Sequence, residues 1–154
     1  MNKVTIYTDG AAQGNPGPGG YGVVMIAGHR RKEISQGFRH TTNNRMELLS
    51  VITALEALKK KGLDITVYSD SRYVVDAVSK GWVFGWKKKN FKGKKNPDLW
   101  QRFLTLHGVY KPRFVWIKGH AANIENEHCD RLAIKAANTP PLAIDIEYEN
   151  TERK

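Results

Sequence analysis

The period of the hydrophobic pattern first changes after residue 43, and this change limits the possible folds more than any other feature. Residues 3–9 and 31–39 alternate between apolar and polar side chains, as half-buried strands do, and residues 21–27 also read as a strand. The short links between these segments favour antiparallel pairing. From residue 44 to residue 60, apolar side chains recur instead at helical spacing. The pattern therefore predicts a three-stranded meander that leads into a helix.

Strands and helices alternate in the remaining sequence. We predict strands over residues 65–69 and 113–118, and helices over residues 71–80, 98–108 and 123–138. A strand–helix–strand unit implies a parallel, right-handed crossover. The expected fold is α/β, a single five-stranded mixed sheet (three antiparallel strands, then parallel strands) with helices on both faces. We expect one domain over residues 1–138 and a loosely ordered tail over residues 139–154.

The charge balance favours a polyanionic partner. The chain carries 25 Lys and Arg residues against 15 Asp and Glu residues, a formal net charge of +10. Nucleic acid is the commonest such partner, although a basic surface can also serve solubility alone. The single cysteine, Cys129, cannot form an internal disulfide, which fits a reducing compartment. Because the sequence has neither an apolar leader nor a segment of membrane-spanning length, we expect a cytoplasmic protein with no membrane contact. We also expect a monomer with no organic cofactor.

Four acidic residues stand where catalytic sites form. Asp9 and Asp70 each end a predicted strand, and ligands of α/β sheets gather outside the carboxyl ends of strands. Glu47 lies in the first turn of its predicted helix, on the stripe that faces inward. Asp130 lies on the apolar side of the last predicted helix. We therefore interpret these four as candidate site residues.

Each acid alone also has an ordinary structural explanation. The alternatives are a capping box between Glu47 and Asn44, a helix cap at Asp70, a turn at Asp9, and an ion pair of Asp130 with Arg131 or Lys135. As a set, however, they need a cation, because two unit charges about 4 Å apart repel by roughly 4 kcal/mol at an effective dielectric of about 20. Ligands that are all oxygen atoms select Mg²⁺ or Mn²⁺.

Four groups of short motifs carry these acids in order. They are TDG at 8–10 with GNPGPGGYG at 14–22, TTNNRME at 41–47, SDS at 69–71 with YV at 73–74, and KGHA at 118–121 with ENE at 125–127 and CD at 129–130. Together they closely resemble the motifs of bacterial type 1 ribonuclease H, in order and spacing, across residues 3–138. The resemblance implies a ribonuclease H-like fold and an endonuclease that cuts the RNA strand of an RNA–DNA hybrid.

The same resemblance implies roles for individual residues. Asp9, Glu47, Asp70 and Asp130 would bind two Mg²⁺ ions, with Mn²⁺ as a substitute, and His120 would assist near the scissile phosphate. The products would carry 5′-phosphate and 3′-hydroxyl ends. The enzyme would have little base-sequence preference, because contacts with phosphates and sugars carry no sequence information directly. The residues expected to contact the hybrid are Asn15, Thr42, Asn43, Asn44, Arg72, Trp82, Trp86, Lys87, Lys88, Lys89 and Lys92.

Two segments of unusual composition fit this partner. The glycine-rich run at 14–20 lacks Gly-Lys-Ser/Thr and leads into a strand, so it is no nucleotide-binding P-loop. We interpret it as a rigid hairpin link that lets Asn15 approach a sugar closely. Residues 82–95 interleave aromatic side chains with six lysines, which favours a nucleic-acid platform over a merely solvated loop. This stretch resembles the basic protrusion of bacterial ribonuclease H in a shortened form.

Two other functions fit parts of the pattern. The first is a related nuclease with the same sheet and acids but another substrate, such as a DNA junction or a single strand. The basic stretch after the predicted helix at 71–80 argues against it. The second is a non-catalytic module that binds hybrids, which would have no use for four acids. Cleavage assays on a hybrid, duplex DNA, duplex RNA and single-stranded RNA separate the three functions.

Overall fold

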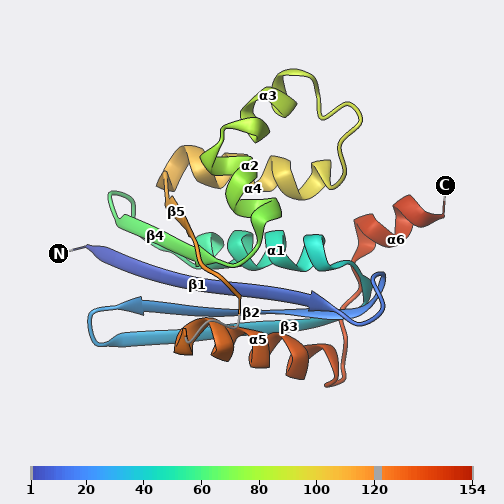
Figure 1. The fold of residues 1–154 in the computed structure, drawn as a ribbon, viewed down its shortest axis with the longest axis horizontal. Coiled ribbons are helices and arrows are strands. Elements are labelled where there is room, and N and C mark those ends of the chain that lie inside the picture. The colour runs from blue at the N-terminus through green and yellow to red at the C-terminus, as the bar shows by residue number, and fades with distance from the viewer. Residues whose placement is uncertain (1, 120–122, 154) are drawn as a thin grey trace.

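The structure, a computed structural model, describes residues 2–119 and 123–153. Within these residues five strands form one sheet, in the order β3-β2-β1-β4-β5 (Figure 1). They are β1 (Lys3–Ala12), β2 (Gly17–Ala27), β3 (Arg30–Thr41), β4 (Asp64–Ser69) and β5 (Arg113–Trp116). The pairs β1–β2 and β2–β3 are antiparallel, whereas β1–β4 and β4–β5 are parallel. The predicted five-stranded mixed sheet is confirmed.

Helices cover both faces of this sheet, as predicted. They are α1 (Asn43–Glu56), α2 (Arg72–Ser79), α3 (Trp82–Lys88), α4 (Pro97–Tyr110), α5 (Ile124–Ala137) and α6 (Ile146–Glu152). Figure 1 shows α1, α2 and α4 on one face and α5 on the other, with α3 beyond α2 and α6 beside the end of β3. Among the described residues, no helix combines the length and apolar character needed to cross a membrane.

The hydrophobic core lies between the sheet and the α1–α4 layer. Alternate residues of β1, Val4 and Ile6, point into it, as the two-residue period requires. The apolar stripe of α1 and the aromatic residues of α4 fill the other side. Burying each such side chain stabilises the fold by about 1.5–3 kcal/mol. The fully buried residues of these helices include Leu48, Val51, Ile52, Leu55, Trp100 and Phe103.

Glycines let α5 rest directly on the opposite face of the sheet. A Cβ atom at Gly22 would lie 2.3 Å from the carbonyl oxygen of Cys129, and one at Gly37 would lie 1.9 Å from that of Ala136. Side chains do not tolerate such distances, so only glycine permits this approach of the helix backbone. The contact sets the depth of α5, the helix that carries Asp130.

Several element boundaries differ from those predicted. The glycines at 17–20, interpreted as part of a link, belong to β2, because they pair with β1 and β3. Helix α1 ends at Glu56 rather than at residue 60. Helix α3 was not predicted at all, because its seven residues, WVFGWKK, show no apolar stripe long enough to have a period.

The helix caps correct two of the structural alternatives. Thr42 caps α1, since its Oγ1 accepts a hydrogen bond from the Arg45 backbone N–H at 3.2 Å. Glu47 is therefore not the partner of Asn44 in a capping box. Ser71 caps α2, with its Oγ accepting from the Val74 N–H at 3.2 Å. Neither Glu47 nor Asp70 thus serves as a helix cap.

The segment that was expected to be a loosely ordered tail contains secondary structure within residues 139–153. Ala143 forms a bridge with Phe38, and α6 follows. Asp145 is buried, 7% exposed, and pairs with Arg45, which lies 100 residues away in the sequence. Hydrophobicity within the segment carries no sign of this charge pair. The boundary between a domain and a C-terminal segment stays a prediction.

Candidate active site

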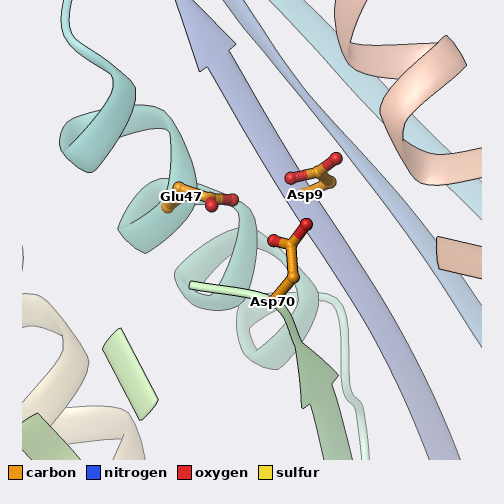
Figure 2. Close-up of side chains that lie close together, drawn as sticks. All are labelled: Asp9, Glu47 and Asp70. Atoms are coloured by element: carbon orange, nitrogen blue, oxygen red, sulfur yellow. The ribbon is translucent and has the colours of Figure 1, made fainter. Parts of the chain in front are cut away.

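The sheet register brings Asp9 and Asp70 together. Thr8 of β1 pairs with Ser69 of β4 in parallel register, so the next residue of each chain segment lies at the same edge of the sheet. Gly10 brings in the third acid. A Cβ atom there would lie 2.4 Å from the backbone nitrogen of Glu47, so glycine allows the first turn of α1 to lie against β1. Figure 2 shows the three carboxylates pointing toward one another.

These three acids form a compact group of oxygen ligands. One carboxylate oxygen from each of Asp9, Glu47 and Asp70 lies within 4.8 Å of the others. Asp9 is buried and the other two are partly buried. Oε1 of Glu47 is itself buried and has no hydrogen-bond partner among the described residues. A buried oxygen without a partner, inside a group of acids, fits a divalent cation.

The pKa shifts of these acids also favour a bound cation. Burial raises the pKa of Asp9 to about 8, with further contributions from the charges of Asp70 and Asp130. Two hydrogen bonds lower the pKa of Asp9 instead. One is with Glu47, and the other is donated by the Gly10 N–H to Oδ1 of Asp9 at 2.9 Å. Burial and the charges of Asp9 and Asp70 also raise the pKa of Glu47 well above its usual range. Three ionised carboxylates are thus unfavourable here without a cation.

Neighbouring groups hold Asp70 in place. Its carbonyl oxygen accepts a hydrogen bond from the Trp116 indole N–H at 3.1 Å. Gly119 packs against its side chain so closely that a Cβ atom at Gly119 would lie 2.9 Å from Oδ2. Arg72 stacks on the same indole, with its guanidinium carbon 3.7 Å from the centroid of the Trp116 ring. A cationic side chain is therefore held close to Asp70, two residues further along the chain.

The other two predicted catalytic residues are Asp130 and His120. Asp130, partly buried in α5, is not one of the three acids whose oxygens lie within 4.8 Å. Its charge nevertheless helps to raise the pKa of Asp9, so it acts on the same group from the opposite face of the sheet. His120 lies outside the residues that the structure describes.

The predicted polar contacts with nucleic acid gather beside the start of α1. Oδ1 of Asn15 accepts a hydrogen bond from the Asn43 backbone N–H at 3.1 Å, and Oδ1 of Asn43 accepts from the Ala12 N–H. These bonds tie the glycine-rich link to the helix start. Asn15, Thr42 and Asn44 also line one cavity of about 680 Å³.

The predicted basic platform is centred on α3. Trp82 is 48% exposed, and the ammonium of Lys80 lies 5.1 Å from its ring centroid. Trp86 is only partly exposed, since its ring meets Trp100 edge-on at 5.8 Å. A second cavity, of about 440 Å³, combines both indoles with lysines; its lining includes Trp82, Trp86, Lys89, Lys92 and Lys94. Lys87 and Lys88 lie exposed at the end of α3.

Comparison with known proteins identifies the family. Residues 1–138 match the family described as RNase H. The chain belongs to the ribonuclease H family. It is 53% identical to ribonuclease H of Rippkaea orientalis over 153 residues, which cover 96% of this chain and 93% of the relative. It is 52% identical to ribonuclease H of Desulforamulus reducens over 151 residues, covering 95% and 94% respectively.

Solved structures of the ribonuclease H family share the fold. The chain is similar to LC9-RNase H1, described as a type 1 RNase H with the type 2 active-site motif, at 32% identity and a TM-score of 0.80, over 90% of this chain and 73% of that one. It is also similar to LC11-RNase H1, solved in complex with an RNA/DNA hybrid, at 28% identity and a TM-score of 0.67, over 88% and 96%. The predicted family, fold and enzyme class, an endoribonuclease of the ribonuclease H type, are confirmed.

Sequence reasoning assigned no role to Arg45, although this residue lies within the ribonuclease H motif at 41–47. Its guanidinium is buried, 4% exposed, and makes bidentate pairs with both Asp98 and Asp145. The one available signal was a charged residue between Asn44 and Met46 on a helix that is otherwise packed into the core. Its partners lie 53 and 100 residues away, so no local pattern reveals them.

Proposed function

We propose that this chain hydrolyses internal phosphodiesters in the RNA strand of RNA–DNA hybrids, with two bound Mg²⁺ ions. The observation that carries the proposal is the group formed by Asp9, Glu47 and Asp70, in which a buried carboxylate oxygen has no partner among the described residues. Family membership and the hybrid complex of LC11-RNase H1 support the choice of substrate.

The carboxylates would hold the cations, with Asp130 completing the set from α5. When bound, the two Mg²⁺ ions supply activation of the attacking water and stabilisation of the leaving 3′ oxygen. Mn²⁺, another hard ion, can substitute. The raised pKa values of Asp9 and Glu47 let the metal-free site retain protons at neutral pH, so cation binding would be accompanied by proton release. The products would carry 5′-phosphate and 3′-hydroxyl ends.

His120 would assist by carrying a proton near the scissile phosphate. It follows Gly119 in the sequence, and Gly119 packs against Asp70. In this role the imidazole is an accessory group, since the carboxylates and their cations do the main chemistry.

Substrate recognition would rest on sugars and phosphates. Asn15, Asn43 and Asn44 would contact 2′-hydroxyls, which distinguish RNA from DNA, while Thr42 lies beside them. Arg72, held on Trp116, would meet the hybrid next to Asp70. The exposed face of Trp82 and the lysines around it would bind the second strand. Such contacts read little base sequence.

The assay that tests this function uses four labelled substrates with Mg²⁺: an RNA–DNA hybrid, duplex DNA, duplex RNA and single-stranded RNA. Cleavage of the hybrid's RNA strand alone is expected, with 3′ ends that a polymerase extends directly. Cleavage of DNA instead would indicate the related nuclease with another substrate. Hybrid binding without any cleavage would indicate the non-catalytic module. Elution at the size of one chain in size-exclusion chromatography would agree with the proposed monomer, and a cytoplasmic location is part of the proposal.

A further inference from the structure

The C-terminal segment is anchored firmly beside the start of α1. The backbone of Ala143 donates to the Gly37 carbonyl at 2.8 Å and accepts from the Arg39 N–H at 2.9 Å. Arg39 then donates two hydrogen bonds to the Glu149 carboxylate, at 2.9 and 2.7 Å. The segment is thus attached to the end of β3 by backbone and by charge, and Figure 1 shows α6 there, close to the N-terminal end of α1.

A buried charge pair completes this anchor. The Arg45 guanidinium donates to Asp145 at 2.7 and 2.9 Å, and the Thr41 hydroxyl donates to the same carboxylate at 2.7 Å. With Arg45 4% exposed and Asp145 7% exposed, the Asp145 charge relies on Arg45, since a buried ion without a partner costs several kcal/mol. Arg45 also donates to Oδ1 of Asn96 at 3.2 Å. The C-terminal segment, α1 and the start of α4 therefore meet at one arginine.

The anchored helix forms a wall of the cavity that contains the proposed nucleic-acid contacts. The cavity, about 680 Å³, is lined by Lys94, Lys95 and Asn96 and also by Glu147, Tyr148 and Thr151 of α6. Asn15, Thr42 and Asn44 line the same cavity. The lysines attract phosphates, whereas Glu147 repels them. A nucleic-acid strand in this cavity would therefore turn its phosphates to the lysines and its sugars to α6.

Tyr148 is held rigidly on this wall. Its hydroxyl donates to Oε2 of Glu152 at 2.9 Å, and Oε1 of the same carboxylate lies 2.6 Å from Nε2 of His40. The Tyr148 ring lies 5.6 Å from the His40 ring and 5.8 Å from the guanidinium carbon of Arg45. A tyrosine fixed in this way offers a flat contact surface at a small cost in conformational entropy.

We propose that the C-terminal segment, residues 143–152, forms part of the nucleic-acid site, with Tyr148 and Thr151 contacting the sugars of one strand of the hybrid. This inference rests on the proposed function, and it extends the binding site beyond the residues that match the family. The observation that carries it is that residues of α6 line the same cavity as the lysines and the polar side chains expected to contact the hybrid.

The test compares Tyr148→Ala with Asn150→Ala, a matched control. Asn150 is exposed on the same helix and does not line the cavity. For each full-length variant we would measure the Kd for a hybrid in EDTA, where no cleavage occurs, then KM and kcat with Mg²⁺, and the melting temperature. Tyr148→Ala is expected to raise Kd and KM about five-fold, the effect of one ordinary polar or packing contact, with little change in kcat. Thr151→Ala should give a smaller rise in the same direction.

If Tyr148→Ala does not fold, Tyr148→Leu replaces it, because leucine keeps an apolar side chain at this position. Tyr148→Leu should also raise Kd. Kd and KM equal to those of Asn150→Ala would overturn the inference, and so would a lower melting temperature with unchanged Kd, since Tyr148 would then be structural only. Wild-type protein that neither binds nor cuts the hybrid would instead refute the proposed function, so the two failures are distinguishable.

Discussion

Asp9 and Asp70 lie at the same level on two neighbouring parallel strands, because the residues before them, Thr8 and Ser69, are paired in the sheet. Their charges are brought together by the backbone itself and not by flexible side chains. The repulsion between them is one reason that the pKa of Asp9 is raised, after burial. The repulsion between these carboxylates is therefore unfavourable in the metal-free site, and a divalent cation would offset it.

Replacing either acid by its amide should abolish cleavage while the fold persists. In Asp70→Asn and Asp9→Asn, a ligand charge is removed but the shape of the side chain is kept. We expect turnover of the hybrid to fall by roughly 10²- to 10³-fold or more, as when one preorganised electrostatic group is removed. Without metal, the melting temperature should stay the same or rise, because like-charge repulsion is reduced. Turnover close to that of the wild type in either variant would refute the role of the carboxylate group.

The metal-free protein should lose stability as the pH rises. The folded-state pKa of Asp9 is about 8, above its ordinary value of about 3.9, so the folded state binds more protons than the unfolded state between these values. Its contribution to stability is therefore full below pH ~4 and is lost as the pH rises through about 8. Glu47 acts in the same direction.

Melting temperatures in EDTA at pH 5 and pH 8 measure this effect, with Asp9→Asn as the control. The fall from the lower to the higher pH should be larger in the wild type than in Asp9→Asn. Added Mg²⁺ should raise the wild-type melting temperature more at the higher pH, where protons compete less for the carboxylates. An identical pH dependence in both proteins would contradict the raised pKa.

Three lysines at the end of α3 should supply salt-dependent affinity. Replacing Lys87, Lys88 and Lys89 with alanine removes exposed charges at the C-terminal end of α3 without touching the core. We expect weaker hybrid binding and almost unchanged turnover at saturation. For each lysine–phosphate interaction removed, the slope of log affinity against log salt should flatten by roughly 0.9 for duplex DNA, with a similar order for a hybrid. An unchanged slope would show that these lysines form a solvated surface only.

His120→Ala should slow turnover without abolishing it. General acid–base assistance is typically worth about 10²- to 10⁴-fold, and the carboxylates would remain intact. Steady-state kinetics should show a fall in kcat, a nearly constant KM and an unchanged melting temperature. A loss of activity that follows a loss of stability would make His120 a structural residue of its loop.

Two glycine-to-alanine substitutions should have opposite effects on stability. Gly37→Ala places a Cβ atom 1.9 Å from the Ala136 carbonyl oxygen, so α5 must move, and overpacking of this kind costs about 1–3 kcal/mol. Gly108, inside α4, has open space where a Cβ atom would lie, so Gly108→Ala should stabilise the protein by up to about 1 kcal/mol. Urea unfolding compares the two. Because α5 carries Asp130, Gly37→Ala should also reduce turnover, whereas equal stability of the two variants would contradict the packing.

Features that rest on short-range patterns could be predicted from the sequence. The change from a two-residue period to a helical period after residue 43, together with the strand and helix patterns that alternate beyond it, was sufficient to predict the order of the main strands and helices. The motifs around Asp9, Glu47 and Asp70 indicated the family, which comparison confirmed. Such patterns can be recognised in the sequence because each depends on residues that lie close together in the chain.

Contacts between residues that are far apart in the sequence, in contrast, are determined only by the tertiary structure. The register of Thr8 with Ser69 brings Asp9 beside Asp70, and Gly10 admits Glu47. The pair of Arg45 with Asp145, 100 residues apart, attaches the segment that begins α6 to α1, whereas the sequence predicted a loosely ordered tail. Each of these contacts depends on strand pairing and close packing between remote residues, and such pairing leaves no period in the sequence on either side.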